Sequence, residues 1–345
     1  MFFASDNSGP VHPQIMAALA TANEGYAMPY GADPIMDGVR ARIREIFEAP
    51  EAAIYLVATG TAANALALAT LSQPWQTIFC SPVAHIHEDE CNAPEFYASG
   101  AKLTLVPGGD KMTPEALRAS IEGEETRGVH GPQRGPVSIT QVTERGGVYS
   151  LAELKALCDV AKSFDLPVHL DGARFANAQM ALGCSAAEMT WKQGVDAVSF
   201  GATKNGAMGV EAVVFFDPAK AWEFELRRKR GAHLFSKHRY LSAQMQGYLA
   251  DDLWLDSARK ANAAAAKLAE GLTAKGAEFL HPVDANMIFC SFPRAVHQKL
   301  HDMGAMYYVW SGSLEGDDPD EHLAARLVCD WSASDEGIER FLSAF

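Results

Sequence analysis

The chain has 345 residues, 48% of them hydrophobic, so it is long enough to form one large domain and a smaller second one. Its 43 acidic residues outnumber its 29 basic ones, and the formal net charge of -14 disfavours binding to nucleic acid or to anionic membranes. No run of about 18 uncharged apolar residues occurs and no basic leader opens the chain, so we expect a cytoplasmic protein.

From residue 50 onward, short β-rich runs alternate with helical patterns. The patterns predict strands at 52–58, 77–81, 102–107, 137–143, 166–173, 195–202 and 211–217, and helices at 61–72, 113–123 and 150–165. Strands that are apolar on both faces and are separated by helices indicate a mostly parallel central sheet covered by helices.

After residue 217 the pattern changes. It predicts helices at 221–231, 237–250, 257–272 and 334–345, and shorter strands at 287–292, 305–310 and 325–331. We therefore predict an N-terminal arm (1–14), a large α/β domain (15–250) and a small C-terminal α+β domain (251–345). The glycine-rich, charged segment 122–136 is expected to be a surface loop.

Ligands of α/β sheets collect beyond the carboxyl ends of the strands, so polar residues directly after predicted strands are the candidates for a site. Thr59, Gly60 and Thr61 lie between a predicted strand and a predicted helix. Free amides at a helix start, a small residue and two hydroxyls can hold a phosphate. The same residues can also form an ordinary turn with a capping hydroxyl.

Two further strand ends carry charged side chains. Asp171 ends an apolar strand and Arg174 follows it, so these two could pair with each other, or the carboxylate could serve a ligand. Lys204 follows the next strand and is surrounded by small residues. A lysine in an apolar pocket is a nucleophile that forms Schiff bases, although a lone lysine can equally extend from a surface loop.

The segment 85–91, HIHEDEC, places two histidines among three carboxylates. This pattern could indicate a metal site or a metal-dependent hydrolase. No distant motif supplies further ligands, and carboxylates at successive positions cannot all face one ion, so we predict no metal site.

Together these features fit one cofactor. Pyridoxal 5′-phosphate requires an anion cradle for its phosphate, a carboxylate for its ring nitrogen and a lysine for its aldehyde. An imidazole stacked on the ring would complete such a site. A non-catalytic binding protein would leave Lys204 and Asp171 without a reason for their positions.

Nearly the whole chain resembles the L-threonine aldolases (low-specificity type), which have the aspartate-aminotransferase-like fold of the fold type I pyridoxal-phosphate enzymes. The resemblance is carried by the order of seven motifs: FASDNSG, YGADP, ATGTAANALAL, AHIHEDE, HLDGARFANA, SFGATKNG and ARLVCDW. Ile35 stands where the family usually has threonine, and RRKRGAHLFSKHRY replaces a glycine-rich segment found in many members.

The resemblance implies a role for each cofactor-binding residue. Lys204 would hold the cofactor, Asp171 would pair with its ring nitrogen, and Arg174 would lie near its 3′-oxygen. Phosphate and neighbouring groups would be held by Thr59, Gly60, Thr61, Thr203 and Arg230, with Lys237 as the alternative to Arg230. His85 would stack on the ring because Glu90 follows it at the family's spacing, with His87 as the alternative.

The resemblance also implies substrate contacts. Ser5 and Arg326, together with Arg174, would bind the amino acid's carboxylate, and Tyr30 would line the entrance from across a subunit interface. His130 matches a loop histidine that lies near the substrate hydroxyl in the family. Either His85 or His130 would then act as the catalytic base.

The implied activity is that of a carbon-carbon lyase. It would reversibly cleave L-threonine, L-allo-threonine and related β-hydroxy-α-amino acids such as phenylserine to glycine and an aldehyde. The resemblance implies a homodimer or homotetramer with active sites at subunit interfaces. The alternative is another fold type I lyase that performs β-elimination or decarboxylation, because the fold does not determine the reaction.

Overall fold

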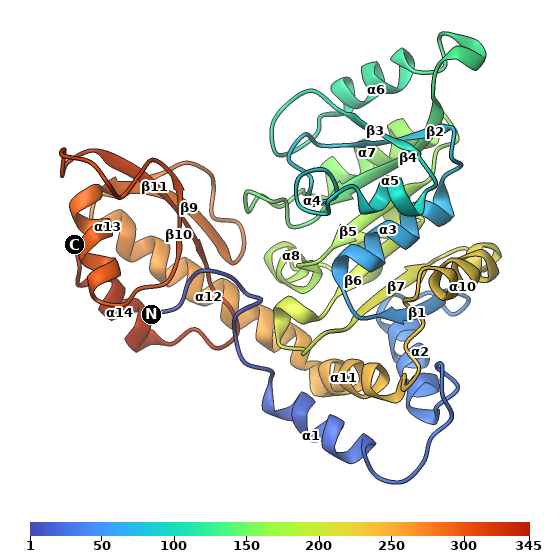
Figure 1. The fold of residues 1–345 in the computed structure, drawn as a ribbon, viewed down its shortest axis with the longest axis horizontal. Helices are drawn as coiled ribbons and strands as arrows, with labels where there is room; N and C mark the ends of the chain where they lie inside the picture. The colour runs from blue at the N-terminus through green and yellow to red at the C-terminus, as the bar shows by residue number, and fades with distance from the viewer.

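The computed structural model describes all 345 residues, which form a large and a small β-sheet joined by a long helix (Figure 1). The large sheet has the strand order β1-β7-β6-β5-β4-β2-β3. Its strands are β1 (Ala53–Val57), β2 (Gln76–Cys80), β3 (Lys102–Leu105), β4 (Gln133–Thr140), β5 (Val168–Gly172), β6 (Ala197–Gly201) and β7 (Glu211–Phe215). Only β7 runs antiparallel to its neighbours, which confirms the predicted mostly parallel sheet.

Helices surround this sheet and continue into the small domain. The α-helices are α1 (Pro13–Ala22), α2 (Pro34–Ile46), α3 (Gly60–Leu71), α4 (His85–Glu88), α5 (Ala93–Tyr97), α6 (Pro114–Gly123), α7 (Leu151–Lys162), α8 (Phe175–Leu182), α9 (Ala186–Met189), α10 (Ala221–Arg230), α11 (Arg239–Leu249), α12 (Leu253–Ala274), α13 (Arg294–Asp302) and α14 (Asp335–Leu342). Short 3-10 turns are η1 (Gly128–His130), η2 (Trp191–Gln193), η3 (Thr203–Asn205), η4 (Pro218–Lys220) and η5 (Ala250–Asp252). None of the helices combines the length and apolar character needed to cross a membrane.

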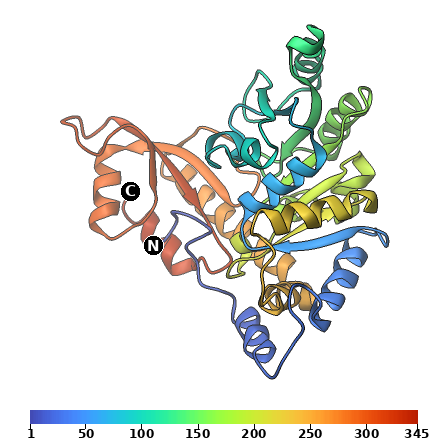
Figure 2. The same cartoon turned by 45° about the vertical axis from the view of Figure 1, so that its right-hand side comes forward.

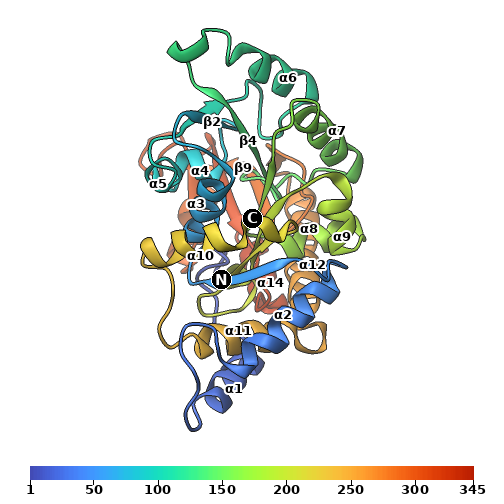
Figure 3. The same cartoon turned by 90° about the vertical axis from the view of Figure 1, so that its right-hand side faces the viewer.

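Both faces of the large sheet are buried, as Figure 2 shows by the helices on its two sides. Alternate residues of a strand point to opposite faces, so Tyr55 packs with Phe224 of α10 while its neighbour Leu56 belongs to a core of 50 buried residues on the other face. Figure 3 shows α1, α2 and α11 at one end of the large domain and α6 and α7 at the opposite end.

Seven of the α-helices, the two-residue strand β8 and part of β4 were not predicted from the sequence; the helices are α1, α2, α4, α5, α8, α9 and α13. α1 and α2 precede residue 50, where the predicted pattern begins. The start of α2 nevertheless carries two sequence signals of a helix: Asp33 caps it by accepting a hydrogen bond from the Met36 amide at 3.0 Å, and Pro34 occupies its first position. β4 begins at Gln133, so the last part of the segment expected to be a loop belongs to the sheet.

The small sheet contains β8 (Glu278–Phe279), β9 (Met287–Pro293), β10 (Tyr308–Ser311) and β11 (His322–Val328) in the antiparallel order β10-β11-β9-β8. Its core of 16 buried residues includes Phe3 from the chain start. The Phe3 amide donates to the Met306 carbonyl at 2.8 Å, and the Val328 amide donates to the Phe3 carbonyl at 2.8 Å. The first residues of the arm therefore pack on the small sheet.

Helix α12 belongs to both cores. Trp254 and Ala258 in its first half pack in the large core, whereas Leu268 and Leu272 in its second half pack in the small core. The helix and the arm thus connect the two sheets.

Candidate active site

The carboxyl ends of β1, β5 and β6 border a cavity of about 440 Å³. The structure brings many of the residues singled out in the sequence to this cavity: Thr59, Gly60, Thr61, His85, Asp171, Thr203 and Lys204. They come from four separate parts of the sequence and meet because parallel strands end at the same edge of a sheet.

The start of α3 forms one wall of the cavity. The Thr59 hydroxyl caps the helix by accepting a hydrogen bond from the Ala62 amide at 3.2 Å. The amides of Gly60 and Thr61 have no acceptor within the helix. A side chain added at Gly60 would meet no atom within 4 Å, and both residues line the cavity, so open space adjoins this first turn. Such a helix start favours an anion.

Lys204 lies in the turn η3, directly after β6, and its half-buried side chain borders the cavity. Its amine forms no hydrogen bond or ion pair within the chain. Asn205 anchors the turn by donating to the Tyr248 hydroxyl at 2.9 Å and to the Trp254 carbonyl at 2.8 Å. A side chain at Gly201 would lie 2.4 Å from the Ala173 carbonyl oxygen, so only glycine fits before the lysine turn.

A chain of hydrogen bonds connects Asp171 to His85. Asn64 of α3 donates from its side-chain nitrogen to Asp171 Oδ2 at 3.0 Å and to Glu90 Oε1 at 2.9 Å. His85 Nδ1 lies 2.9 Å from the same Glu90 oxygen. When Nδ1 donates to this carboxylate, Nε2 is left free to accept a proton.

The charges around His85 change its acid-base behaviour. Burial alone would lower the pKa of His85, but the hydrogen bond to Glu90 and the nearby carboxylates of Asp171 and Glu144 raise it above its ordinary value. Burial raises the pKa of Glu90, which is itself almost fully buried.

Arg174 does not pair with Asp171, so the alternative in which these two residues neutralise each other is wrong. Instead, Arg174 forms a buried two-bond pair with Asp6, with Nε to Oδ2 at 2.6 Å and Nη2 to Oδ1 at 3.0 Å. The Asp171 oxygens accept from the Asn64 side chain and from the Ala173 amide. The strand-end carboxylate at 171 therefore carries no cationic partner.

The N-terminal arm and β11 supply the predicted carboxylate-binding residues. Arg326 Nη1 donates to the Ala4 carbonyl at 3.3 Å, which places its guanidinium beside Ser5 in the chain. Burial, followed by repulsion from Arg174, lowers the pKa of Arg326. Asn7, two residues beyond Ser5, lines the cavity. Tyr30 is half exposed, with Lys229 over its ring, and does not line the cavity of its own chain.

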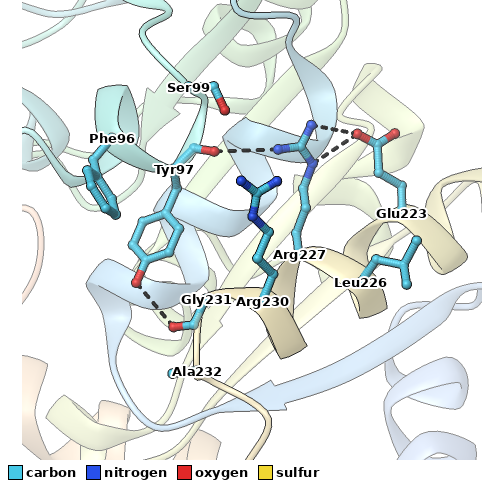
Figure 4. A pocket seen from close by; sticks show the side chains of 9 residues that line it. All are labelled: Phe96, Tyr97, Ser99, Glu223, Leu226, Arg227, Arg230, Gly231 and Ala232. Carbon is cyan, nitrogen blue, oxygen red and sulfur yellow. Dashed lines mark hydrogen bonds and ion pairs between the residues drawn. The ribbon is translucent and has the colours of Figure 1, made fainter.

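Within one chain, the structure does not bring Arg230 to this cavity. Arg230 lines a separate cavity of about 690 Å³ between α5 and α10, together with Tyr97 and Arg227 (Figure 4). There Arg227 is held by Glu223 through two hydrogen bonds, whereas Arg230 forms none. The alternative residue, Lys237, is exposed.

His130 also lies away from the cavity within one chain. It precedes β4, whose last residue, Thr140, pairs with Asp171. The eight residues of β4 extend over about 26 Å, so His130 is at the opposite edge of the sheet. Only His85 of the two predicted bases lies beside Lys204 and Asp171 in one chain.

Three polar cavity residues were not singled out in the sequence: Asn7, Asn64 and Glu211. Asn64 lies in the alanine-rich run of α3, and its spacing from the α3 start gives the only sequence signal that it faces the site. Glu211 opens an apolar strand, where a carboxylate is uncommon, and this signal could have been noted.

The cavity fits pyridoxal 5′-phosphate. The free amides of Gly60 and Thr61 match a phosphate, the unpartnered Lys204 amine matches an aldehyde, and Asp171 matches a ring nitrogen. Asn64 Oδ1 is buried without a hydrogen-bond partner, so the site has an unused acceptor. No group of three or more His, Cys, Asp or Glu side chains is arranged to hold a metal ion.

Comparisons with known proteins agree with this reading of the fold. The chain aligns with the solved structure of a Leishmania major threonine aldolase with a TM-score of 0.92 and 26% identity, covering 99% of this chain and 97% of the other. A serine palmitoyltransferase from Sphingomonas wittichii aligns with a TM-score of 0.73 and 15% identity, covering 100% of this chain and 86% of the other. At this identity the likeness concerns the fold alone. The fold and the site define an enzyme of the aspartate-aminotransferase-like class.

Sequence comparison is more specific. The family model described as beta-eliminating lyase matches residues 3–294. Low specificity L-threonine aldolases from Pseudomonas sp. (strain NCIMB 10558) and from Pseudomonas aeruginosa are 39% and 40% identical, covering 97% and 98% of this chain and 94% of each relative. The chain belongs to the beta-eliminating lyase family and, within it, to the low-specificity L-threonine aldolases.

Proposed function

We propose that this protein is a pyridoxal 5′-phosphate-dependent aldolase that reversibly cleaves L-threonine, L-allo-threonine and related β-hydroxy-α-amino acids to glycine and an aldehyde. The observation that carries the proposal is the placement of Lys204, Asp171 and the free α3 amides around one cavity. The identity of about 40% to low specificity L-threonine aldolases supports the choice of reaction.

Each part of the cofactor has residues to hold it. Gly60 and Thr61 amides and the Thr59 and Thr203 hydroxyls would hold the phosphate, and Lys204 would bind the aldehyde through its amine. The Asp171 carboxylate, oriented by Asn64, would keep a proton on the ring nitrogen. When bound, the cofactor supplies an electron sink for the electron pair of the broken Cα–Cβ bond.

The substrate's carboxylate and hydroxyl have separate partners. Arg326 and Ser5, with Arg174, would bind the carboxylate and so fix the amino acid in the cavity. His85 Nε2 would accept the proton of the β-hydroxyl, because Glu90 holds the Nδ1 proton. We propose His85 rather than His130 as the base, since only His85 lines the cavity of its own chain.

A second candidate reaction is β-elimination, because the matching family model is described as beta-eliminating lyase. The two reactions yield different products from L-threonine. Aldol cleavage yields glycine and acetaldehyde, whereas β-elimination yields a 2-oxo acid and ammonia.

The test combines product analysis with one substitution. Purified protein loaded with cofactor is incubated with L-threonine, L-allo-threonine and phenylserine, and glycine, aldehyde, 2-oxo acid and ammonia are measured. We expect glycine and aldehyde in equal amounts, and a visible absorbance band that borohydride bleaches. Lys204→Ala should lose both band and turnover, whereas Lys275→Ala, at an exposed surface lysine, should keep them.

Release of 2-oxo acid and ammonia without glycine would establish β-elimination instead. A Lys204→Ala protein that kept both the absorbance band and aldehyde release would overturn the assignment of the lysine.

We also propose that the protein forms a homodimer or homotetramer with active sites at subunit interfaces. Large apolar side chains are exposed on the single chain, including Phe96 and Leu226, which line the cavity that contains Arg230, and Trp222 of α10. Burial of such side chains between subunits would favour association. The same arrangement would allow Tyr30, Arg230 and His130 to reach a neighbouring subunit's site.

A further inference from the structure

Glu211 is a buried carboxyl group in the wall of the proposed cofactor cavity, with no role in the reaction described above. It is the first residue of β7 and pairs with Val57, the last residue of β1, and with Gly201, the last residue of β6. Glu211 is 6% exposed and lines the cavity. Glu211 therefore lies between the segment that begins α3 and the turn that carries Lys204.

The Glu211 carboxyl has no ion-pair partner. Oε2 accepts a hydrogen bond from the Ala202 amide at 2.7 Å, and no arginine or lysine forms an ion pair with the carboxyl. The titratable groups whose charges act on it are Lys204 of η3 and the Tyr248 hydroxyl of α11. Asp171, Glu90 and His85 line the same cavity.

Burial raises the pKa of Glu211 to about 7, although the Thr203 and Ala202 hydrogen bonds and Lys204 oppose the shift. Near neutral pH this carboxyl is therefore divided between its neutral and charged forms. A phosphate held by the free amides of α3 would bring a second negative charge to the same cavity. Because the Glu211 carboxyl is buried, water screens its repulsion from a nearby like charge only weakly, and protonation of the carboxyl removes that repulsion.

We propose that Glu211 belongs to the phosphate side of the cofactor site and takes up one proton when pyridoxal 5′-phosphate binds. The proton comes from solvent and adds to the Glu211 carboxylate, while no bond of the phosphate forms or breaks. The neutral carboxyl keeps its hydrogen bond from Ala202 and gains an O–H donor. This inference rests on the proposed function, because it requires that pyridoxal 5′-phosphate occupy the cavity.

The experiment measures the proton balance and affinity of binding to cofactor-free protein. Titration calorimetry with pyridoxal 5′-phosphate, in buffers of different ionisation enthalpy, gives the number of protons taken up. Glu211→Gln is a neutral replacement of similar size, and Glu270→Gln, at an exposed residue of α12, is the matched control. Pyridoxal, which lacks the phosphate, is the control ligand.

Above about pH 7, we expect the Kd of the unchanged protein to rise about tenfold per pH unit relative to that of Glu211→Gln. The unchanged protein and Glu270→Gln should take up about one proton more than Glu211→Gln near pH 8. The difference should be much smaller with pyridoxal. The Lys204 amine can react with either ligand, so its effect on Glu211 is common to both, and the difference between the ligands reports the phosphate.

An equal proton balance in the unchanged protein and Glu211→Gln would overturn the inference and leave the proposed function intact. Absence of any binding of pyridoxal 5′-phosphate to the unchanged protein would instead refute the proposed function. If Glu211→Gln does not fold, Glu211→Asp retains the carboxyl and should retain the proton uptake; loss of uptake in a folded Glu211→Asp would count against the proposal.

Discussion

His85 is oriented by partners that are themselves held in place. Glu90 accepts from both His85 and Asn64, and Asn64 also reaches Asp171. The imidazole and the strand-end carboxylate are therefore connected through two buried side chains. In such a network the position of each member depends on the others, so a change at one affects the rest.

At the residue scale, the raised pKa of His85 predicts the pH dependence of turnover. The imidazole must be neutral to accept a proton, so the acid limb of kcat/KM, which reports the enzyme without substrate, should lie above the ordinary histidine value of about 6.5. His85→Asn should lower kcat about 10²- to 10⁴-fold and remove this limb. His130→Asn serves as the comparison: pH–rate profiles in which only His130→Asn loses the limb would transfer the role to His130.

The sequence alone predicts the residues that follow strand ends, but not their pairing. Asp171, Lys204 and the 59–61 turn could be found because strand ends are visible as breaks in apolar runs. The partner of Arg174 could not be found, because Asp6 lies 168 residues away and no local spacing connects them. The contacts of Asn64 could not be found for the same reason, because they arise only when α3 packs beside β5 and the segment around Glu90. Glu211 carried a local signal as a carboxylate at the start of an apolar strand, but its place between β1 and β6 depends on the strand order.

At the element scale, α3 combines two tasks at its first turn. Thr59 caps the helix, and the next two residues line the cavity. Most of the helix is buried, so the turn has little freedom to move. A rigid helix start presents its amides to an anion without first having to be ordered.

Removal of this cap should affect stability and cofactor binding together. Thr59→Ala should lower the free energy of unfolding by about 1 kcal/mol and weaken pyridoxal 5′-phosphate binding. Thr113 caps α6 in the same way, because its hydroxyl accepts a hydrogen bond from the Ala116 amide at 3.2 Å, but it does not line the cavity. Thr113→Ala should therefore lose similar stability but keep its affinity for the cofactor. Denaturant unfolding and a binding titration check both; equal affinities in the two variants would contradict the assignment of Thr59.

The elements of the large sheet were predictable because their strands are apolar on both faces and are separated by helices. α2 could have been predicted from the Asp33 cap and Pro34. The strand order could not be predicted. β7 lies between β1 and β6 as an antiparallel strand, and no periodicity in the sequence encodes that placement.

At the scale of the whole molecule, the two ends of the chain meet beside the site. Phe3 packs against Phe341 with ring centroids 5.3 Å apart, and Ala4 accepts a hydrogen bond from Arg326. The position of Ser5 and Asp6 thus depends on the small domain. Arg174 of the large domain pairs with Asp6, which connects the arm to the other side of the site.

This arrangement predicts that a core substitution in the arm weakens substrate binding. Phe3→Ala should lower the free energy of unfolding by about 3 to 5 kcal/mol and raise KM, because Ser5 and the Ala4 carbonyl lose their anchor. Phe292→Ala removes a buried ring from the same small core without touching the arm, and should lose similar stability while KM stays unchanged. Steady-state kinetics at a temperature where both variants are folded distinguish them; an unchanged KM in Phe3→Ala would contradict the prediction.

The contact between Phe3 and Val328 also has a consequence for synthesis of the chain on the ribosome. The Phe3 carbonyl accepts a hydrogen bond from the Val328 amide, and Val328 is synthesised near the end of translation. The first residues therefore lack this hydrogen bond while most of the protein is translated. Contacts between such distant residues are slow to form. We therefore expect the large sheet to assemble early, whereas the site becomes able to bind an amino acid only after β11 has left the ribosome.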